Sequence, residues 1–528
     1  MTARVVVVGA GPRTAGLLGA LASTLPRDVE VTVVDRGPQA SSPWDAGQAA
    51  HVLSNSYARD ITLTRPGVGV GTFLEWCRGV CATDLARTGG EPEELVREAR
   101  GMSELDFASR GLVGSYVAAV IADATARAPF ATRCTAGDVV RVRPGSAPRV
   151  DLADGRTLSA DVVVLATGDD DPGPPVLGAS GPRTLDALTP GQPVLVRGIG
   201  LTFHDVLAAV TVGRGGRFEH ARAGLRYVPS GAEPQVWATS RTGVPLGPKL
   251  APIALTSSTL GWDDGLALLR QCTDVPAAHR AVLDLLARVL STTGRDLLLA
   301  QLKGVGSTAH EARRHLAAQV RSITAPEPER LAAQSCVLAT LEAIAGPVLA
   351  PPSGYLERAA HATAALESIG ARLTSGPPAR RTRELAALVD QGVVVLAGAE
   401  EGIVPDADGW TLRTRSGERV TGFPAFVDAR VHPRRALWAT GPGWPRTPGG
   451  RLDVDPTTMR LRAAAGEDEH AVFVVGPSGA GAIAALPRPG GPETFFQQND
   501  ALACAVADLL SSPVDVPLVP AGSAHDVS

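Results

Sequence analysis

The residues with the clearest chemical meaning are two glycines near the start of the chain and an acidic residue that follows them. Gly9 and Gly11 are separated by a single residue, and Asp35 ends the next apolar run along the chain. A glycine at position 9 permits a sharp turn, and a side chain at position 11 would keep a pyrophosphate away from the backbone. A carboxylate at position 35 can accept hydrogen bonds from the hydroxyls of a ribose. This combination predicts a dinucleotide-binding site, the alternative being a βαβ turn that binds nothing.

The segments around the glycines have the patterns needed to position them. Residues 5–8 are an apolar, β-branched run typical of a strand in a parallel sheet, and residues 29–34 predict a second strand. Residues 14–25 have a helical pattern, so the free N–H groups and positive dipole end of that helix would face the phosphates. The third glycine of the usual fingerprint is missing because position 14 is Thr. That position governs how closely helix and strand pack, so the change loosens the match but leaves the phosphate site.

Two further stretches in the first third of the chain could reach the same site. A loop rich in Gly, Pro and Asn spans residues 36–71 and carries Trp44 and Asn55, which could lie beside a cofactor ring. The alternative is a loop anchored by a buried tryptophan, and the residues favour neither. A buried strand over residues 161–165 runs into Ala-Thr167-Gly168, whose small side chains let the backbone pass close to a cofactor.

The strand–glycine–helix pattern occurs a second time in the middle of the chain. A strand from Val194 to Arg197 is followed by Gly198, Gly200 and an apolar helical segment. Arg241 lies just beyond the next strand, where a guanidinium can bind the 2′-phosphate of an adenosine bidentately. The long separation between Gly198 and Arg241 requires an insertion. We expect a second nucleotide site here, the alternative being a βαβ unit that has lost its nucleotide.

A long segment after the second unit has a different character. Residues 262–375 are rich in Ala, Leu and Arg and show helical periodicity, which predicts a helical insertion serving as a substrate cap or an oligomer surface. His310, Glu311 and His315 do not predict a metal site, because histidines five residues apart do not share a helix face. The six cysteines, at positions 77, 81, 134, 272, 336 and 504, provide neither paired metal ligands nor a disulfide framework. We expect no metal.

Composition excludes several classes of function. The 528 residues are 44% hydrophobic and 20% charged, which describes a globular protein of about two to four domains. The formal net charge of −4 argues against a nucleic-acid partner. No apolar run is long enough to span a bilayer, and the first strand begins too early for a leader peptide. We expect a cytoplasmic protein without a membrane partner.

Taken together, these motifs resemble those of bacterial FAD/NAD(P)-binding proteins. That group is distantly similar to the two-dinucleotide flavoproteins that include N-hydroxylating and Baeyer–Villiger monooxygenases. The resemblance is carried by Gly9-Ala-Gly11-Pro12-Arg13, Asp35, Ala-Thr167-Gly168, Val-Arg-Gly198-Ile-Gly200, Ser-Arg241 and Phe-Val-Asp-Ala-Arg430. The departures are Thr14 and a last strand that ends in Gly-Pro477, where many flavoproteins have Gly-Asp.

The resemblance implies where two cofactors would bind. FAD is expected on the N-terminal unit and NADPH, less securely, on the central one. The implied FAD contacts are Asp35 on the ribose, the turn from Gly11 through Pro12 to Arg13 on the pyrophosphate, and Val139 near the adenine. The remaining residues of the predicted cofactor-binding set are Gly9, Arg36, Trp44, Asn55, Thr167, Gly168, Gly198, Gly200 and Arg241.

The predicted fold is of the α/β class, with a Rossmann-like FAD-binding domain and a second nucleotide-binding domain. The FAD-binding domain is expected to be discontinuous, over residues 1–190 and 441–528. The NAD(P)-binding-like domain is expected over residues 191–261 and 376–440, and the mostly helical insertion over residues 262–375.

The predicted function is that of an FAD-dependent oxidoreductase, in the first place an NAD(P)H-using monooxygenase acting on a small-molecule substrate. The flavin carries such chemistry, which explains why no catalytic triad or carboxylate pair is visible. One alternative is an FAD-dependent dehydrogenase or oxidase that does not use NAD(P)H, and another is a non-catalytic redox sensor or partner protein. Asn55 or His204 could contribute hydrogen bonds, but no catalytic residue is assigned. The substrate, the pathway and a possible homo-oligomer stay open.

Overall fold

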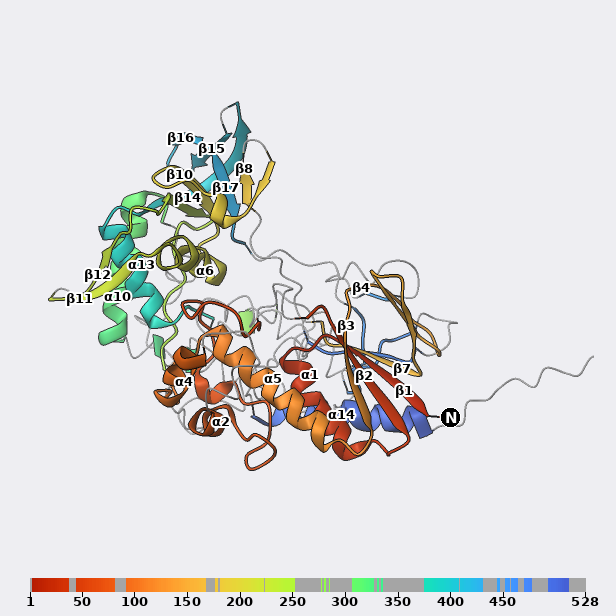
Figure 1. Ribbon diagram of the computed structural model, residues 1–528. Coiled ribbons are helices and arrows are strands. Elements are labelled where there is room, and N and C mark those ends of the chain that lie inside the picture. Colours follow the sequence, from red (N-terminus) through yellow and green to blue (C-terminus); the bar gives the residue numbers. More distant parts are fainter. Residues whose placement is uncertain are drawn as a thin grey trace, which may run out of the picture.

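Two large β-sheets with parallel central strands organise the computed structural model (Figure 1). The structure describes residues 2–37, 44–80, 92–167, 176–178, 181–222, 224–251, 306–326, 375–407, 409–430, 444–446, 452–455, 457–463, 470–476 and 492–511, with Ala277, Arg280, Ala281, Asp284, Arg330, Leu331, Gln334 and Ser335. Within these residues, no helix combines the length and the apolar composition needed to cross a membrane.

The first sheet contains five parallel strands in the order β18-β7-β1-β2-β3. They are β1 (Ala3–Val8), β2 (Val29–Asp35), β3 (Ala131–Ala136), β7 (Val162–Leu165) and β18 (Val472–Val474). The three strands predicted in this part of the chain are confirmed. β18 lies beside β7 although it comes from near the C-terminus, so the two ends of the chain build one sheet.

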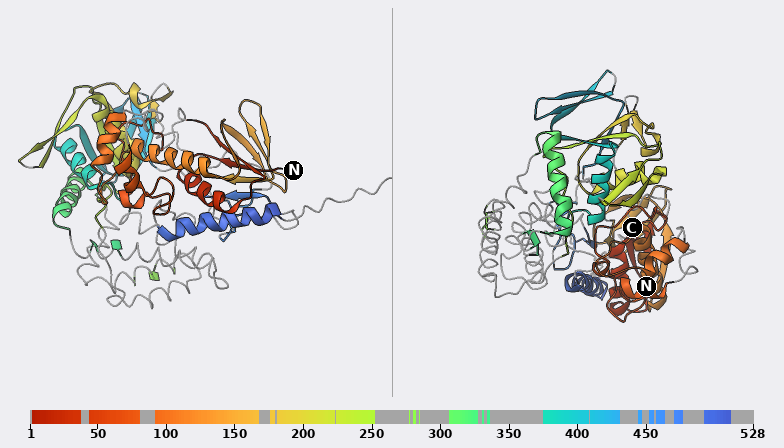
Figure 2. Two further views of the ribbon diagram at one scale, coloured as in Figure 1. Left: turned by 60° about the horizontal axis from the view of Figure 1, so that its bottom comes forward. Right: turned by 90° about the vertical axis from the view of Figure 1, so that its left-hand side faces the viewer.

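Alternating side chains along β1 serve two different layers. Val5 and Val7 pack in one cluster with the helices, whereas Val6 and Val8 pack in another on the opposite face. The helices on the first face are α1 (Pro12–Thr24), α5 (Arg110–Arg127) and α14 (Pro492–Ser511). The opposite face carries an antiparallel sheet of β4 (Val139–Arg143), β5 (Arg149–Leu152) and β6 (Thr157–Ser159). Figure 2 shows α14, in blue, running alongside α1.

The second sheet has eight strands in the order β16-β15-β14-β13-β10-β17-β8-β9. Its centre is β10 (Pro193–Arg197), which is parallel to β13 (Gln235–Ser240) and to β17 (Ala425–Asp428), while β14 (Val394–Asp406) runs parallel to β13. One face is covered by α6 (Leu201–Val210), α10 (Ala309–Thr324) and α13 (Ala379–Asp390). This sheet has the order of a second nucleotide-binding unit around β10.

The remaining elements extend the two units. They are α2 (Phe73–Gly79), α4 (Pro92–Arg100), β8 (Val176–Gly178), β9 (Gly181–Arg183), β11 (Arg217–Ala221), β12 (Gly224–Val228), β15 (Gly409–Thr414) and β16 (Arg419–Phe423), with short 3-10 helices at Ala58–Asp60, Leu185–Ala187 and Val212–Arg214. The hairpin of β11 and β12 is the insertion expected between Gly198 and Arg241.

The structure covers only part of the predicted helical insertion. α10 confirms the helical pattern of its own stretch, and most of residues 262–375 lie outside the described residues. β8 pairs with β17 in the second sheet, and β9 pairs with β8 at its edge. The division of the chain into three domains stays a prediction.

Candidate functional site

The turn after β1 can be made only by a glycine at position 9. The backbone of Gly9 has a φ of +99°, which side chains rarely tolerate. A Cβ there would lie 2.6 Å from the carbonyl oxygen of Ala166 and 3.3 Å from Cα of Thr167. The N–H of Gly9 donates to the carbonyl of Val34 at 2.7 Å. The chain thus turns sharply between the ends of β2 and β7.

The N-terminus of α1 opens directly from this turn. Gly11 is the N-cap residue, no side chain caps the helix there, and Pro12 has no N–H. A Cβ added at Gly11 would meet no atom within 4 Å. The first N–H groups of a helix lack partners inside the helix, and the positive end of its dipole attracts anions. The geometry at Gly11 therefore has the room and the donors that a pyrophosphate needs.

Asp35 faces the same turn from the end of β2. Its Oδ2 accepts a hydrogen bond from the N–H of Ala10 at 2.8 Å, and its Oδ1 accepts one from the N–H of Gly37 at 2.9 Å. Each carboxylate oxygen has a second lone pair, so the group can still accept hydrogen bonds from ribose hydroxyls. Gly137, two residues before Val139, donates to the carbonyl of Asp35. Val139, at the start of β4, thus follows a segment bonded to the end of β2, and its contact with the adenine stays a prediction.

The hydroxyl group of Thr14 explains how the turn tolerates the missing third glycine. Thr14 is completely buried, and its Oγ1 donates a hydrogen bond of 2.6 Å to the carbonyl of Gly9. The side chain that replaces the glycine thus satisfies a buried acceptor in the turn itself.

Arg13 is a half-buried cation without a carboxylate partner in the described part of the chain. Its guanidinium carbon lies 5.1 Å from the centre of the Phe495 ring, and Nη1 is 3.4 Å from Oε1 of Gln498. Nη2 is buried and has no hydrogen-bond partner. Burial lowers the pKa of Arg13 to about 9, because water no longer solvates the cation. Such an arginine beside an open helix N-terminus fits the anionic diphosphate of FAD.

The other residues predicted for the first site are distributed over several elements. Thr167 lies against Gly9, and Arg36 is exposed next to Asp35. Trp44 packs in the cluster formed with α2, α4 and α5. The carbonyl of Asn55 accepts a hydrogen bond from Nζ of Lys249, in the second unit.

Not all of the residues predicted for the first site lie together in the structure. The structure brings Gly9, Gly11, Asp35 and Thr167 together, and it ties Asn55 to the second unit. Gly168 lies outside the described residues.

The second glycine turn repeats the geometry of the first. Gly198 has a φ of +102°, and its N–H donates to the carbonyl of Thr239, at the end of the neighbouring strand, at 2.8 Å. A Cβ at Gly198 would lie 3.0 Å from the backbone of Ala429, which follows β17. Gly200 is the N-cap of α6, again without a side-chain cap. The two turns differ at the end of the second strand, where Ser240 stands in the place of Asp35.

A cavity of about 590 Å³ lies over this second turn. Gly198, Gly200 and Arg241 line it, so the structure brings together the three residues predicted for the pyridine nucleotide. Arg241 has no hydrogen bond or ion pair within the described residues, whereas Ser240 accepts a hydrogen bond from the N–H of Gly243 at 2.9 Å. An exposed guanidinium beside a hydroxyl suits a phosphate monoester better than a ribose diol.

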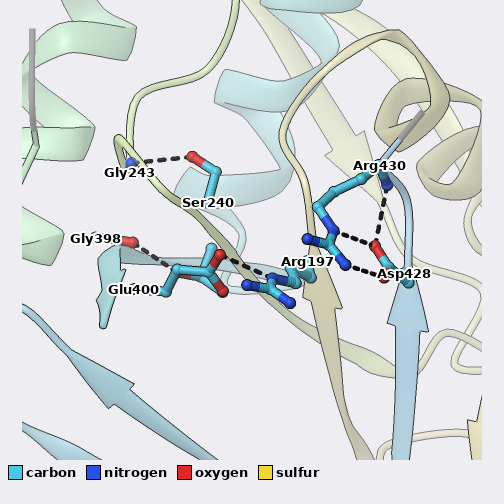
Figure 3. A network of polar contacts seen from close by, with 8 residues as sticks. Arg197, Ser240, Gly243, Gly398, Glu400, Asp428 and Arg430 are labelled. Atoms are coloured by element: carbon cyan, nitrogen blue, oxygen red, sulfur yellow. Dashed lines mark hydrogen bonds and ion pairs between the residues drawn. The ribbon is translucent and has the colours of Figure 1, made fainter. Parts of the chain in front are cut away.

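Three charged residues that line the cavity, Arg197, Glu400 and Arg430, take part in two ion pairs (Figure 3). Arg197 donates to Oε1 of Glu400 at 2.8 Å, and Arg430 makes a two-pronged contact with Asp428 at 2.6 and 2.8 Å. Oε2 of Glu400 is buried and has no hydrogen-bond partner among the described residues. None of these ion-paired residues was predicted as a site residue from the sequence, although Asp428 and Arg430 belong to the segment that carried the resemblance.

His204 and the segment from His310 to His315 have structural surroundings in the folded chain. His204 lies within α6 and is 4% exposed, and burial lowers its pKa to about 3, with Arg381 adding to the effect. It is therefore neutral in the folded protein at neutral pH. Glu311 caps α10 through a reciprocal pair of hydrogen bonds with Thr308. No group of three or more metal-binding side chains occurs within the described residues.

Comparison with known proteins identifies the first unit. A family model described as FAD-NAD(P)-binding matches residues 6–170. The predicted fold class, the cofactor class and the resemblance to FAD/NAD(P)-binding proteins are confirmed. The open helix N-terminus at Gly11 and the Arg13 side chain lie within the residues that this family model matches.

Curated relatives are similar to this chain over somewhat less than half of its length. An L-aspartate N-monooxygenase (nitrosuccinate-forming) of Streptomyces cremeus is 35% identical over 280 residues, which are 46% of this chain and 42% of that protein. A nitrosuccinic acid synthase of Aspergillus oryzae is 31% identical over 274 residues, 46% of this chain and 40% of its own length. The chain thus spans less than half the length of the curated relatives that it matches.

Solved structures align over more of the chain, but their structural similarity to it is low. Cyclohexanone monooxygenase with bound cyclohexanone covers 96% of this chain and 87% of its own, at 14% identity and a TM-score of 0.44. A similarity of that degree carries no argument about function.

Proposed function

We propose that this chain is an FAD-dependent monooxygenase that takes electrons from NADPH and oxygenates the amino nitrogen of a small amino acid. The observation that carries the proposal is the pair of glycine turns at the ends of two sheets in one chain. The first turn has a carboxylate, Asp35, at the ribose position, and the second has Ser240 followed by Arg241. One chain thus offers both a site for FAD and a site for a phosphorylated pyridine nucleotide.

The substrate class is taken from the relatives. Both curated relatives named above form nitrosuccinate, and one is named as acting on L-aspartate. The amino group of L-aspartate, or of a similar small amino acid, is therefore our proposal for the nitrogen that receives oxygen. A location in the cytoplasm and assembly into a homo-oligomer belong to the same proposal.

The roles of this chain's residues follow from their geometry. Gly11 leaves the N-terminus of α1 open to the diphosphate, Arg13 supplies a cation beside it, and Asp35 orients the ribose. Arg241 holds the 2′-phosphate of NADPH over the second turn. FAD, when bound, supplies the transfer of electrons and the activation of oxygen, while the protein positions the reactants and excludes water.

The proposal is tested by anaerobic reduction of the purified protein reconstituted with FAD. Addition of NADPH should bleach the flavin absorbance, and admitting air with L-aspartate should yield an N-oxygenated product with matching NADPH consumption. A flavin that stays oxidised with NADPH but is bleached by a metabolite would replace this proposal with a dehydrogenase. A bound flavin that no reductant bleaches would replace it with a non-catalytic flavoprotein.

A further inference from the structure

Unpartnered polar nitrogens gather between α1 and α14. Nη2 of Arg13, Nε2 of Gln498 and Nδ2 of Asn499 are all buried and lack a hydrogen-bond partner in the part of the chain that the structure describes. Gln498 is 3% exposed and Asn499 is 2% exposed. Buried donors are nearly always paired in folded proteins, because an unmade hydrogen bond is unfavourable there. Three such donors on two adjoining helices indicate a site for a group rich in acceptors.

The hydrogen bond between Arg13 and Gln498 fixes how the amide is oriented. Oε1 of Gln498 faces Nη1 of Arg13, so its Nε2 points away from the cation as a donor. The acidic residue nearby on α14 is already paired, since Asp500 accepts a hydrogen bond from Arg65 at 2.6 Å. The described part of this cluster thus presents positive charge and N–H groups, and no carboxylate pairs with them. Its ligand should be anionic.

The cluster lies where an extended dinucleotide would pass. Arg13 directly follows Gly11 and Pro12 at the open end of α1. On its other side, a Cβ added to Gly476, just after β18, would lie 3.9 Å from Cγ of Arg13. Dinucleotides run across the carboxyl ends of the strands in this kind of sheet. The cluster therefore lies between the diphosphate position over β1 and the end of β18.

We propose that α14 is part of the flavin-nucleotide site. Gln498 donates a hydrogen bond to the diphosphate or ribityl oxygens of FAD beside Arg13. No glycine motif indicates this contact, because α14 is far from the N-terminal turn in sequence. The inference rests on the proposed binding of FAD to the first unit.

Substitution of Gln498 by an acid separates this role from a purely structural one. Gln498→Glu places a carboxylate against Arg13, which should stabilise the FAD-free protein and raise its melting temperature. The same carboxylate repels the diphosphate and occupies the arginine, so FAD binding should weaken by roughly a hundredfold. Gln498→Leu removes the donor without adding charge, and should weaken FAD binding about tenfold. Binding is read from the fluorescence of FAD titrated into the FAD-free protein.

Gln497 provides the matched control, because it is the neighbouring glutamine on α14 and is only half-buried. Gln497→Glu should change FAD affinity less than twofold. If the wild-type protein binds FAD and both Gln498 variants bind it equally well, the role of α14 is wrong while the proposed function stands. If the wild-type protein does not bind FAD at all, the proposed function itself is wrong. Should Gln498→Glu fail to fold, Gln498→Leu decides the question alone.

Discussion

Asp35 and Ser240 end equivalent strands, yet they present different chemistry to a ribose. The carboxylate of Asp35 accepts hydrogen bonds and would repel a phosphate on the ribose. The hydroxyl of Ser240 carries no charge, and Arg241 follows it at the rim of the cavity. At the scale of single residues, this exchange is the basis on which we propose two different nucleotides for two similar turns.

Removal of Arg241 should therefore affect NADPH much more than NADH. We expect Arg241→Ala to raise the KM for NADPH by about tenfold to a hundredfold, because a charge-assisted contact with the phosphate is lost. The KM for NADH should change little. Steady-state kinetics with both nucleotides measure it. Arg222→Ala, at an exposed arginine beyond β11, is the control. Equal losses for the two nucleotides would contradict the assignment of the 2′-phosphate to Arg241.

The hydrogen bond made by the Thr14 hydroxyl should contribute more to the stability of the protein than the volume of the Thr14 side chain does. Thr14→Val keeps the volume but leaves the carbonyl of Gly9 without its hydrogen bond, at a cost of about 1–3 kcal/mol. Thr14→Ser keeps the donor and should lose less. Urea unfolding of the two variants compares them, and a valine variant as stable as the serine variant would show that the hydrogen bond contributes nothing.

His204 should make the stability of the protein depend on pH. Its pKa is about 3 in the folded state and 6.5 as the reference value, so the unfolded chain binds the proton more readily. The contribution of the neutral histidine is complete above pH 6.5 and is lost as the pH falls toward 3. We expect about 2 kcal/mol of stability to disappear from this residue between pH 8 and pH 5. Urea unfolding of His204→Leu at both values should show a smaller decline than the wild-type protein.

At the scale of elements, Gly11 at the start of α1 and Gly19 within it allow cofactor binding to be tested separately from folding. A Cβ at Gly11 or at Gly19 would meet nothing within 4 Å, so neither position needs glycine for packing. Gly11 is at the open helix end, while Gly19 lies inside the helix. A methyl group at Gly11 would occupy the space of the diphosphate. One at Gly19 would only reduce the freedom of the unfolded chain.

Matched alanine substitutions test this difference. Gly11→Ala should fold normally and weaken FAD binding by about tenfold or more, because the backbone can no longer approach the diphosphate. Gly19→Ala should raise stability by about 0.5–1 kcal/mol and leave FAD binding unchanged. Circular dichroism and FAD titration measure the two effects. An FAD affinity that survives Gly11→Ala would move the diphosphate away from α1.

At the scale of the whole molecule, contacts between the two units decide how the nucleotides meet. Arg110, at the start of α5, pairs with Asp205 of α6 at 2.8 Å. Arg381 of α13 donates to the carbonyl of His51, and Lys249 donates to that of Asn55. The first contact joins α5 to the second unit, and the other two join the loop before α2 to it. They do not touch either glycine turn.

Charge reversal at the first of these contacts should slow electron transfer without abolishing nucleotide binding. Arg110→Asp and Asp205→Arg each create a like-charged pair, whereas the double variant restores attraction. The pair is about one quarter exposed on each side, so its effect on stability should stay near or below about 1 kcal/mol. Anaerobic stopped-flow reduction by NADPH should be slower in each single variant and recover in the double one. Unchanged rates in the single variants would mean that this contact does not align the units.

The two nucleotide-binding units could be predicted from local sequence alone. Gly9, Gly11 and Asp35, and later Gly198, Gly200 and Arg241, stand at spacings that depend on a strand, a turn and a helix adjacent in the chain. Backbone geometry over so short a distance is set by local residue types, so the pattern could be read without the fold.

The surroundings of those turns depend on tertiary packing and could not be predicted in this way. The folded chain places the hydroxyl of Thr14 on the carbonyl of Gly9, brings Gln498 of α14 against Arg13, and pairs Arg197 with Glu400 in the lining of the second cavity. These partners lie on different elements, and Gln498 and Glu400 come from hundreds of residues away. Contacts of that kind arise from the packing of sheets and helices, which no spacing along the chain encodes.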